Sequence, residues 1–179
     1  MFKIDDTLIL LIDFQERFVP VIFNYELLEK NIITFIKGCR ILELPIITMQ
    51  QYTKGLGETV QPLKDALGEF EHIEKMTFSC FGTTEFENAL KAIQRTNIIV
   101  LGIEAHVCVQ QTVLDLLERD YNVYVLADCI GSRKELDKIY AEKRMRQAGA
   151  VITTMESVLF ELLVRADHPK RKEISNLVK

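Results

Sequence analysis

The chain has 179 residues, of which 48% are hydrophobic and 27% are charged, and its formal net charge is −4. This composition is typical of a globular protein, so we expect residues 1–179 to form a single domain and we exclude a disordered chain. Because the chain is acidic and has no long basic stripe, we expect no nucleic-acid partner.

The N-terminus and the cysteines bear on the cellular compartment. Residues 1–6 carry acids, which transit peptides avoid, and no signal-peptide cleavage region follows them. No apolar stretch reaches the roughly 18 residues that a membrane helix needs, so we expect no membrane partner. The four cysteines show no CxxC spacing, and a domain of this size needs no disulfides. We therefore expect a cytoplasmic protein.

Along the chain, apolar runs that predict strands alternate with patterns that predict helices. In the first half we expect a strand at 7–13, a helix at about 22–43, a strand at 46–49, a flexible loop at 55–58, a strand or extended connector at 72–76 and a helix at 83–95. In the second half we expect strands at 97–102, 123–128 and 151–154, and helices at 106–119, 132–148, 157–165 and 169–177. Continuous apolar runs are typical of strands that are covered on both faces.

The repeated strand–helix order predicts the fold class, a three-layer α/β/α arrangement around a six-stranded parallel sheet. Ligands bind such a sheet at its carboxyl edge, next to the point where the strand order reverses. With the order 3-2-1-4-5-6, residues after the first and fourth strands flank this point, whereas Lys75, after the third strand, has to reach back along the edge. The loop 55–58 is no phosphate loop, since the sequence has neither GxxxxGK[ST] nor GxGxxG.

Cys108 is the first candidate for a reactive residue. It follows the strand 97–102 at the predicted start of a helix, where exposed N–H groups and the positive end of the helix dipole favour a thiolate over a thiol. Backbone donors at the same turn are able to hold a developing oxyanion. The alternative is a small buried apolar side chain, the role that we expect for Cys39 and Cys129, with Cys80 intermediate.

Two further candidates, Asp13 and Lys75, also follow strand-like runs. Asp13, flanked by aromatic residues, is suited to a raised pKa and to the role of a base, with helix capping or pairing with Arg17 as the alternative. Lys75 lies beside apolar residues, where partial desolvation lowers the pKa of its amine and its charge offsets a thiolate. The alternative for Lys75 is a surface pair with Glu74, which would contribute little.

The histidines favour neither a dyad nor a metal site. His106 and Cys108 are two residues apart, and residues at that spacing on a helix do not face each other. His72, His106 and His168 show no ligand spacing, so we expect no metal and no cofactor.

Five stretches together make the chain resemble the isochorismatase-like cysteine hydrolase family, and most closely its isochorismatase-domain-containing branch. They are LIDFQERF at 11–18, QYTKGLG at 51–57, Lys75 with Phe78-Ser79, GIEAHVC at 102–108 and RMRQAGA at 144–150. The resemblance covers nearly the whole chain and implies the Rossmann-like isochorismatase-like hydrolase fold.

The resemblance also implies a triad of Asp13, Lys75 and Cys108. Cys108 would attack a carbonyl or imine carbon, Asp13 would move the thiol proton to the leaving amine, and water would then hydrolyse a thioester-type intermediate. Lys75 would support the thiolate and orient the pair. The family's cis peptide bond maps to Ile103–Glu104, and its oxyanion hole maps to the backbone N–H groups of Glu104 and Cys108.

Three departures from the family pattern restrict the activities that we expect of this chain. Nicotinamidase relatives carry an Asp and His metal cluster after the second strand, where this chain has MQQY at 49–52, so metal and nicotinamide are both disfavoured. True isochorismatases lack the cysteine that is present here as Cys108. Ala105 replaces a threonine that is frequent in the family, which removes a hydroxyl that could contact substrate.

We therefore expect a metal-free hydrolase that acts on an amide-like C–N bond of a small-molecule substrate. The candidate pocket wall is aromatic: Phe14, Phe18, Tyr52 and Phe78. We expect a homo-oligomer, with residues 22–25 and the C-terminal helix as candidate interfaces. One alternative is a non-catalytic binding or scaffold protein that kept the fold. Another is a redox protein that uses Cys108 with Cys80 or Cys129, which the lack of CxxC disfavours.

Overall fold

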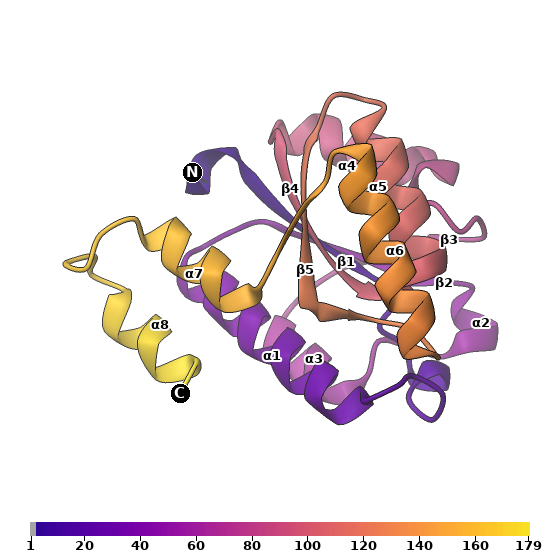
Figure 1. Ribbon diagram of the computed structural model, residues 1–179, viewed down its shortest axis with the longest axis horizontal. Helices are drawn as coiled ribbons and strands as arrows, with labels where there is room; N and C mark the ends of the chain where they lie inside the picture. The colour runs from indigo at the N-terminus through magenta and orange to yellow at the C-terminus, as the bar shows by residue number, and fades with distance from the viewer. Residues whose placement is uncertain (1–2) are drawn as a thin grey trace.

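The structure is a computed structural model that describes residues 3–179, and a six-stranded sheet lies at its centre (Figure 1). The strands are β1 (Thr7–Ile12), β2 (Ile46–Gln51), β3 (His72–Lys75), β4 (Asn97–Ile103), β5 (Asn122–Gly131) and β6 (Val151–Thr153). Their order is β3-β2-β1-β4-β5-β6, and every neighbouring pair is parallel. The predicted fold class is confirmed.

Helices cover both faces of the sheet (Figure 1). On one side of the sheet lie α1 (Tyr25–Ile41), α3 (Gln61–Leu67) and α7 (Met155–Leu163), and α8 (Arg171–Leu177) packs against α1 and α7 on that side. The other face packs against α4 (Thr84–Ile93), α5 (Gln110–Leu117) and α6 (Glu135–Ala148). Short helical turns complete the chain: η1 (Ile4–Asp6), η2 (Glu16–Phe18), α2 (Thr53–Leu56), η3 (Cys80–Gly82) and η4 (Ala105–Val109).

The central strand β1 shows why the apolar runs of the sequence contain no polar alternation. Side chains point alternately to the two faces of a strand. Ile9 and Leu11 therefore belong to the core on the α1 face, whereas Leu8, Leu10 and Ile12 belong to the core on the α5 face. A strand that is buried on both faces is apolar at every position.

The structure departs from the sequence prediction mainly between β2 and β3. The expected loop at 55–58 lies partly within α2, and α3 was not predicted at all. Only Leu63, Ala66 and Leu67 of α3 are buried, too short an apolar pattern to reveal the helical period of 3.6 residues. The uncertain segment 72–76 contains a true strand, because β3 pairs with β2 from Thr48↔His72 to Gln51↔Lys75.

Within residues 3–179, no helix has both the length and the apolar character that a membrane crossing requires.

Candidate active site

Three neighbouring strands deliver polar residues to the same edge of the sheet. Asp13 directly follows β1, Gln51 ends β2 and Lys75 ends β3. The carboxyl ends of parallel strands meet at one edge, and the register places Gln51 opposite Lys75. The Asp13 backbone N–H donates to the carbonyl of Met49 at 3.1 Å, which ties the end of β1 to β2. Asp13 itself is in the left-handed region, with φ of +52°.

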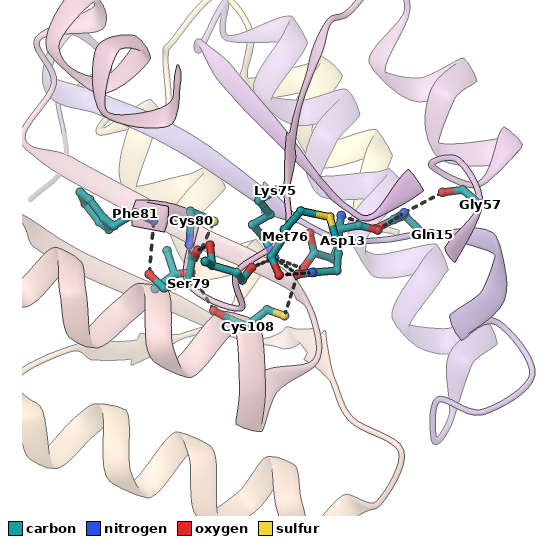
Figure 2. A network of polar contacts seen from close by, with 12 residues as sticks. Asp13, Gln15, Gly57, Lys75, Met76, Ser79, Cys80, Phe81 and Cys108 are labelled. Atoms are coloured by element: carbon teal, nitrogen blue, oxygen red, sulfur yellow. Dashed lines mark hydrogen bonds and ion pairs between the residues drawn. The ribbon is translucent and has the colours of Figure 1, made fainter. Parts of the chain in front are cut away.

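Lys75 does reach back along the edge to Asp13. Its Nζ lies 2.6 Å from Asp13 Oδ2, and both side chains are 0% exposed. The same ammonium donates to Gln51 Oε1 at 2.7 Å and to the Thr77 carbonyl at 3.3 Å. An ammonium has three N–H donors, so all three are in use. Figure 2 shows Asp13 and Lys75 beside each other, with Cys108 close by.

Cys108 comes to this cluster from β4. It lies in the turn η4, where the Val109 N–H donates to the Glu104 carbonyl at 3.2 Å, the five-residue spacing of a π-helix. Only 5% of Cys108 is exposed, and its Sγ lies 4.0 Å from Gln51 Oε1. The Cys108 carbonyl accepts a hydrogen bond of 2.7 Å from Thr112 Oγ1. The structure thus brings together the three residues of the expected triad.

One carboxylate oxygen at the site accepts no hydrogen bond from the residues that the structure describes. Asp13 Oδ2 accepts from Lys75, but Asp13 Oδ1 is buried and has no hydrogen-bond partner among residues 3–179. A buried carboxylate oxygen without a donor is costly, and functional sites are where such groups are found. This oxygen is therefore available to accept a proton.

Burial raises the pKa of the Cys108 thiol to about 12, and the negative charge of Asp13 adds to this shift against the opposing charge of Lys75. The expectation of a thiolate stabilised by a helix N-terminus is wrong for the resting site. A short turn buried beside a carboxylate disfavours a second negative charge more strongly than its N–H groups favour one.

The pKa values of Asp13 and Lys75 are set by two opposing effects, burial and the attraction between the two charges. Burial raises the pKa of Asp13, opposed by the charge of Lys75. Burial lowers the pKa of Lys75, but attraction to the Asp13 carboxylate and the hydrogen bond to it act in the other direction, and the net result is a raised pKa. Lys75 is therefore held as an ammonium, contrary to the lowered pKa expected from its apolar neighbours.

The predicted aromatic pocket wall divides into two groups. Phe14 is buried in the core on the α1 face, where it stacks on Tyr25 with 5.4 Å between ring centroids, and Phe18 packs against the same core. This corrects the prediction for Phe14, because its side chain points to the helix layer rather than to the edge of the sheet. Tyr52 and Phe78 are exposed, and Tyr52 lines a cavity of about 600 Å³ together with Lys75.

Sequence reasoning missed two glutamines that organise the site. Gln15 Oε1 accepts from the Gln51 backbone N–H at 2.8 Å, and Gln15 Nε2 donates to the Gln51 carbonyl at 3.0 Å. The Gln51 side chain donates through Nε2 to the Met76 carbonyl at 3.0 Å, which turns its Oε1 toward Lys75. The available signals were LIDFQERF at 11–18, which contains Gln15, and MQQY at 49–52, which contains Gln51.

The turn that precedes Cys108 has its own polar contacts. The Ile103–Glu104 peptide bond is cis, at the position that the family resemblance implies. The Glu104 carboxylate pairs with Arg133, and His106 Nδ1 lies 2.9 Å from Ser132 Oγ. His106 thus contacts Ser132, which follows β5. In the part of the chain that the structure describes, no group of three or more His, Cys, Asp or Glu side chains is arranged to hold a metal ion.

Comparison with known proteins identifies the family. The isochorismatase domain model matches residues 7–157. Isochorismatase domain-containing protein 1 of Danio rerio is 42% identical over 168 residues, which are 93% of this chain and 59% of that protein. The chain thus spans less than two thirds of that relative's length.

Solved structures agree with this result. The structure of MAR1 ribonuclease from Caenorhabditis elegans is 40% identical, with a TM-score of 0.93 over 99% of this chain and 91% of the other. The YcaC gene product of Escherichia coli, described as an octameric hydrolase of unknown specificity, is 25% identical, with a TM-score of 0.89 over 98% and 86% of the two chains. On sequence and structure together, this chain belongs to the isochorismatase family.

Proposed function

We propose that this protein is a metal-independent cysteine hydrolase that cleaves an amide-like C–N bond in a small molecule. The observation that carries the proposal is the fully buried Asp13–Lys75 ion pair next to Cys108 at the carboxyl edge of the sheet. A buried ion pair contributes little net stability to a fold, because desolvation of the two charges offsets their attraction. Strongly shifted pKa values around a potential nucleophile are typical of active sites.

In the resting state, Asp13 is a carboxylate, Lys75 an ammonium and Cys108 a neutral thiol. As Sγ attacks the carbonyl carbon, the thiol proton moves to Asp13 Oδ1, which has no hydrogen-bond partner among the described residues. The negative charge passes from Asp13 to the substrate oxygen, and Lys75 remains its counter-charge. The backbone N–H groups of Glu104 and Cys108 are the proposed donors to that oxygen.

The second half of the reaction returns every group to its starting state. Asp13 gives its proton to the leaving nitrogen as the C–N bond breaks, which releases the amine and leaves a thioester on Cys108. Water then attacks the thioester carbon and passes a proton to Asp13. The C–S bond breaks, the acid leaves, and Asp13 returns the proton to Sγ. Because Asp13 removes the proton during attack, a resting thiol with a high pKa is compatible with catalysis.

The relatives bear on partners and on rival activities. The octameric Escherichia coli hydrolase supports a homo-oligomer for this chain. The name of the Caenorhabditis elegans structure makes RNA a substrate to test, although a chain of net charge −4 gains nothing from electrostatic attraction to phosphates. The scaffold and redox alternatives remain, and the cytoplasmic location stays a prediction.

The test is acylation of Cys108 by p-nitrophenyl acetate, followed by intact-protein and peptide mass spectrometry. We expect a burst of nitrophenolate and one acetyl group on Cys108 in the wild type, and neither in Cys108→Ser. Cys39→Ala is the matched control, because Cys39 is buried in the apolar core away from the site. Small amides and carbamoyl compounds then form the substrate panel, with RNA as a separate arm.

Three outcomes would count against the proposal. A folded wild type without acylation at Cys108 favours the scaffold alternative. RNA cleavage that survives Cys108→Ser places that activity outside the proposed triad. A disulfide between Cys108 and Cys80 under mild oxidant, without acyl transfer, favours the redox alternative.

A further inference from the structure

The end of the β4–β5 ladder places the turn that carries Cys108 next to the segment after β5. The last paired residues of the two strands are Ile103 and Gly131. Because the strands are parallel, the residues that follow this pair leave the sheet side by side. Glu104 begins the turn on one side, and Ser132 and Arg133 follow on the other.

Two consecutive residues after β5 hold two alternate residues of the turn. Arg133 donates from Nε to Glu104 Oε1 at 2.7 Å and from Nη2 to Oε2 at 3.1 Å, the bidentate geometry that makes such pairs strong. Ser132 Oγ lies 2.9 Å from His106 Nδ1. The Ser132 carbonyl accepts from the Phe23 N–H at 3.0 Å, so this segment is itself anchored.

The burial of the acid distinguishes this pair from an ordinary surface salt bridge. The Glu104 side chain is only 8% exposed, whereas that of Arg133 is 56% exposed. A surface pair contributes little, but a buried carboxylate that loses its cation remains desolvated and unpaired. Glu104 also holds the turn, since its carbonyl accepts from the N–H groups of Val107 and Val109 at 3.1 and 3.2 Å.

We propose that Arg133 is a positioning residue for the reaction proposed above. Through the Glu104 carboxylate it fixes the turn 104–109, and with it the backbone N–H groups of Glu104 and Cys108 that would face the developing oxyanion. The inference rests on the proposed function. It implies that Arg133 affects steps that create an oxyanion and leaves simple alkylation of the Cys108 thiol unchanged, because alkylation creates no such charge.

The experiment compares two reagents that react with the same sulfur. The rates of Cys108 acylation by p-nitrophenyl acetate and of alkylation by iodoacetamide are measured in the wild type, Arg133→Ala and Arg133→Lys. Arg165→Ala is the matched control, because Arg165 makes the same bidentate contact to Asp167 at 2.8 and 2.7 Å, but with an exposed acid. We expect acylation to fall roughly 10- to 100-fold in Arg133→Ala, since small displacements of catalytic groups have effects of this size.

Three further results are expected if Arg133 acts through the fork of its guanidinium. Alkylation of Arg133→Ala stays within about twofold of the wild type, as a change in geometry alone leaves the thiol unaltered. Added guanidinium restores part of the acylation rate of Arg133→Ala. Arg133→Lys stays slow in acylation, because an ammonium cannot make two parallel bonds to one carboxylate.

Several results would overturn the positioning role. Unchanged acylation in Arg133→Ala does so, and so does an equal loss of acylation and alkylation, which would indicate a structural role only. If Arg133→Ala does not fold, Arg133→Lys decides by the same comparison of the two rates. If even the wild type is not acylated at Cys108, the proposed function fails first and the positioning role fails with it.

Discussion

The two faces of the sheet bury the same kind of side chain with different consequences. Each face holds two of the four cysteines: Cys39 and Cys129 with α1, and Cys80 and Cys108 with α4 and α5. Burial raises the pKa of all four thiols. The second pair also lies in the field of the buried Asp13–Lys75 ion pair.

A thiol that is only buried is inert, as is usual for cysteines in a protein core. Reactivity needs a group that removes the proton and a charge that compensates for its loss. In the proposed mechanism, Asp13 at the end of β1 and Lys75 at the end of β3 take these two roles beside the α5 face. On the α1 face, Cys39 belongs to a cluster of buried hydrophobic side chains. Variants that change one face and not the other test this distinction.

The largest expected effect is on stability, from removing one partner of the ion pair. Lys75→Met leaves the Asp13 carboxylate buried and uncompensated, so we expect a loss of about 3–5 kcal/mol in the free energy of unfolding. The double variant with Asp13→Asn should recover part of that loss, because no charge is then stranded. Urea unfolding measures both.

The matched control for Lys75→Met lies on the other face. Leu159 in α7 is buried in the α1 core, and Leu159→Ala should cost about 2–5 kcal/mol through the cavity that it creates. It should leave the rate of Cys108 alkylation unchanged, whereas Lys75→Met should lower it. Equal effects of both variants on alkylation would contradict the distinction between the two faces.

The second prediction concerns the pH dependence of Cys108 alkylation. Because burial and Asp13 raise the pKa of Cys108 to about 12, alkylation should be slow at neutral pH. Below that pKa the rate should rise about tenfold per pH unit, since the thiolate fraction does so. Native Cys39 should stay unlabelled across the same range.

Asp13→Asn sharpens this prediction, because two readouts should move in opposite directions. Removing the negative charge of Asp13 lowers the pKa of Cys108, so alkylation at neutral pH should become faster. Hydrolysis of an amide should become slower by about 100-fold or more, because the group proposed to carry the proton to the leaving nitrogen is lost. A variant that alkylates more slowly than the wild type would refute the assigned role of the Asp13 charge.

The smallest expected effect comes from Gln51. Gln51→Ala leaves one N–H of the Lys75 ammonium without its acceptor at 2.7 Å, so we expect a loss of about 1–3 kcal/mol in stability, with a slower acylation of Cys108. Gln61→Ala is the control, since Gln61 makes an exposed bond of 2.7 Å to Asp65 and should change stability by less than about 0.5 kcal/mol. Equal losses of stability in the two variants would contradict a stabilising role for the bond between Gln51 and Lys75.

The sequence alone predicted most of the architecture because strands that are buried on both faces are unmistakable. The runs at 7–13 and 97–102 became the central strands β1 and β4, and the strand–helix rhythm indicated a parallel sheet. Residues at strand ends, Asp13 and Lys75, could be identified as candidates on the same grounds. The helices α2 and α3 were missed because they are short and carry few buried residues.

The sequence by itself determined the fold class and the family, and it named the candidate site residues. The reason is that the periodicity of each segment and the residues at strand ends can be recognised in short stretches of sequence. What only the tertiary structure decided was how those residues meet. The register of β2 and β3 brings Lys75 to Asp13 across 62 positions, and burial there keeps the Cys108 thiol neutral. The pairing of Glu104 with Arg133 follows in the same way from where the β4–β5 ladder ends. Burial and contact between distant segments set pKa values, and no local pattern encodes them.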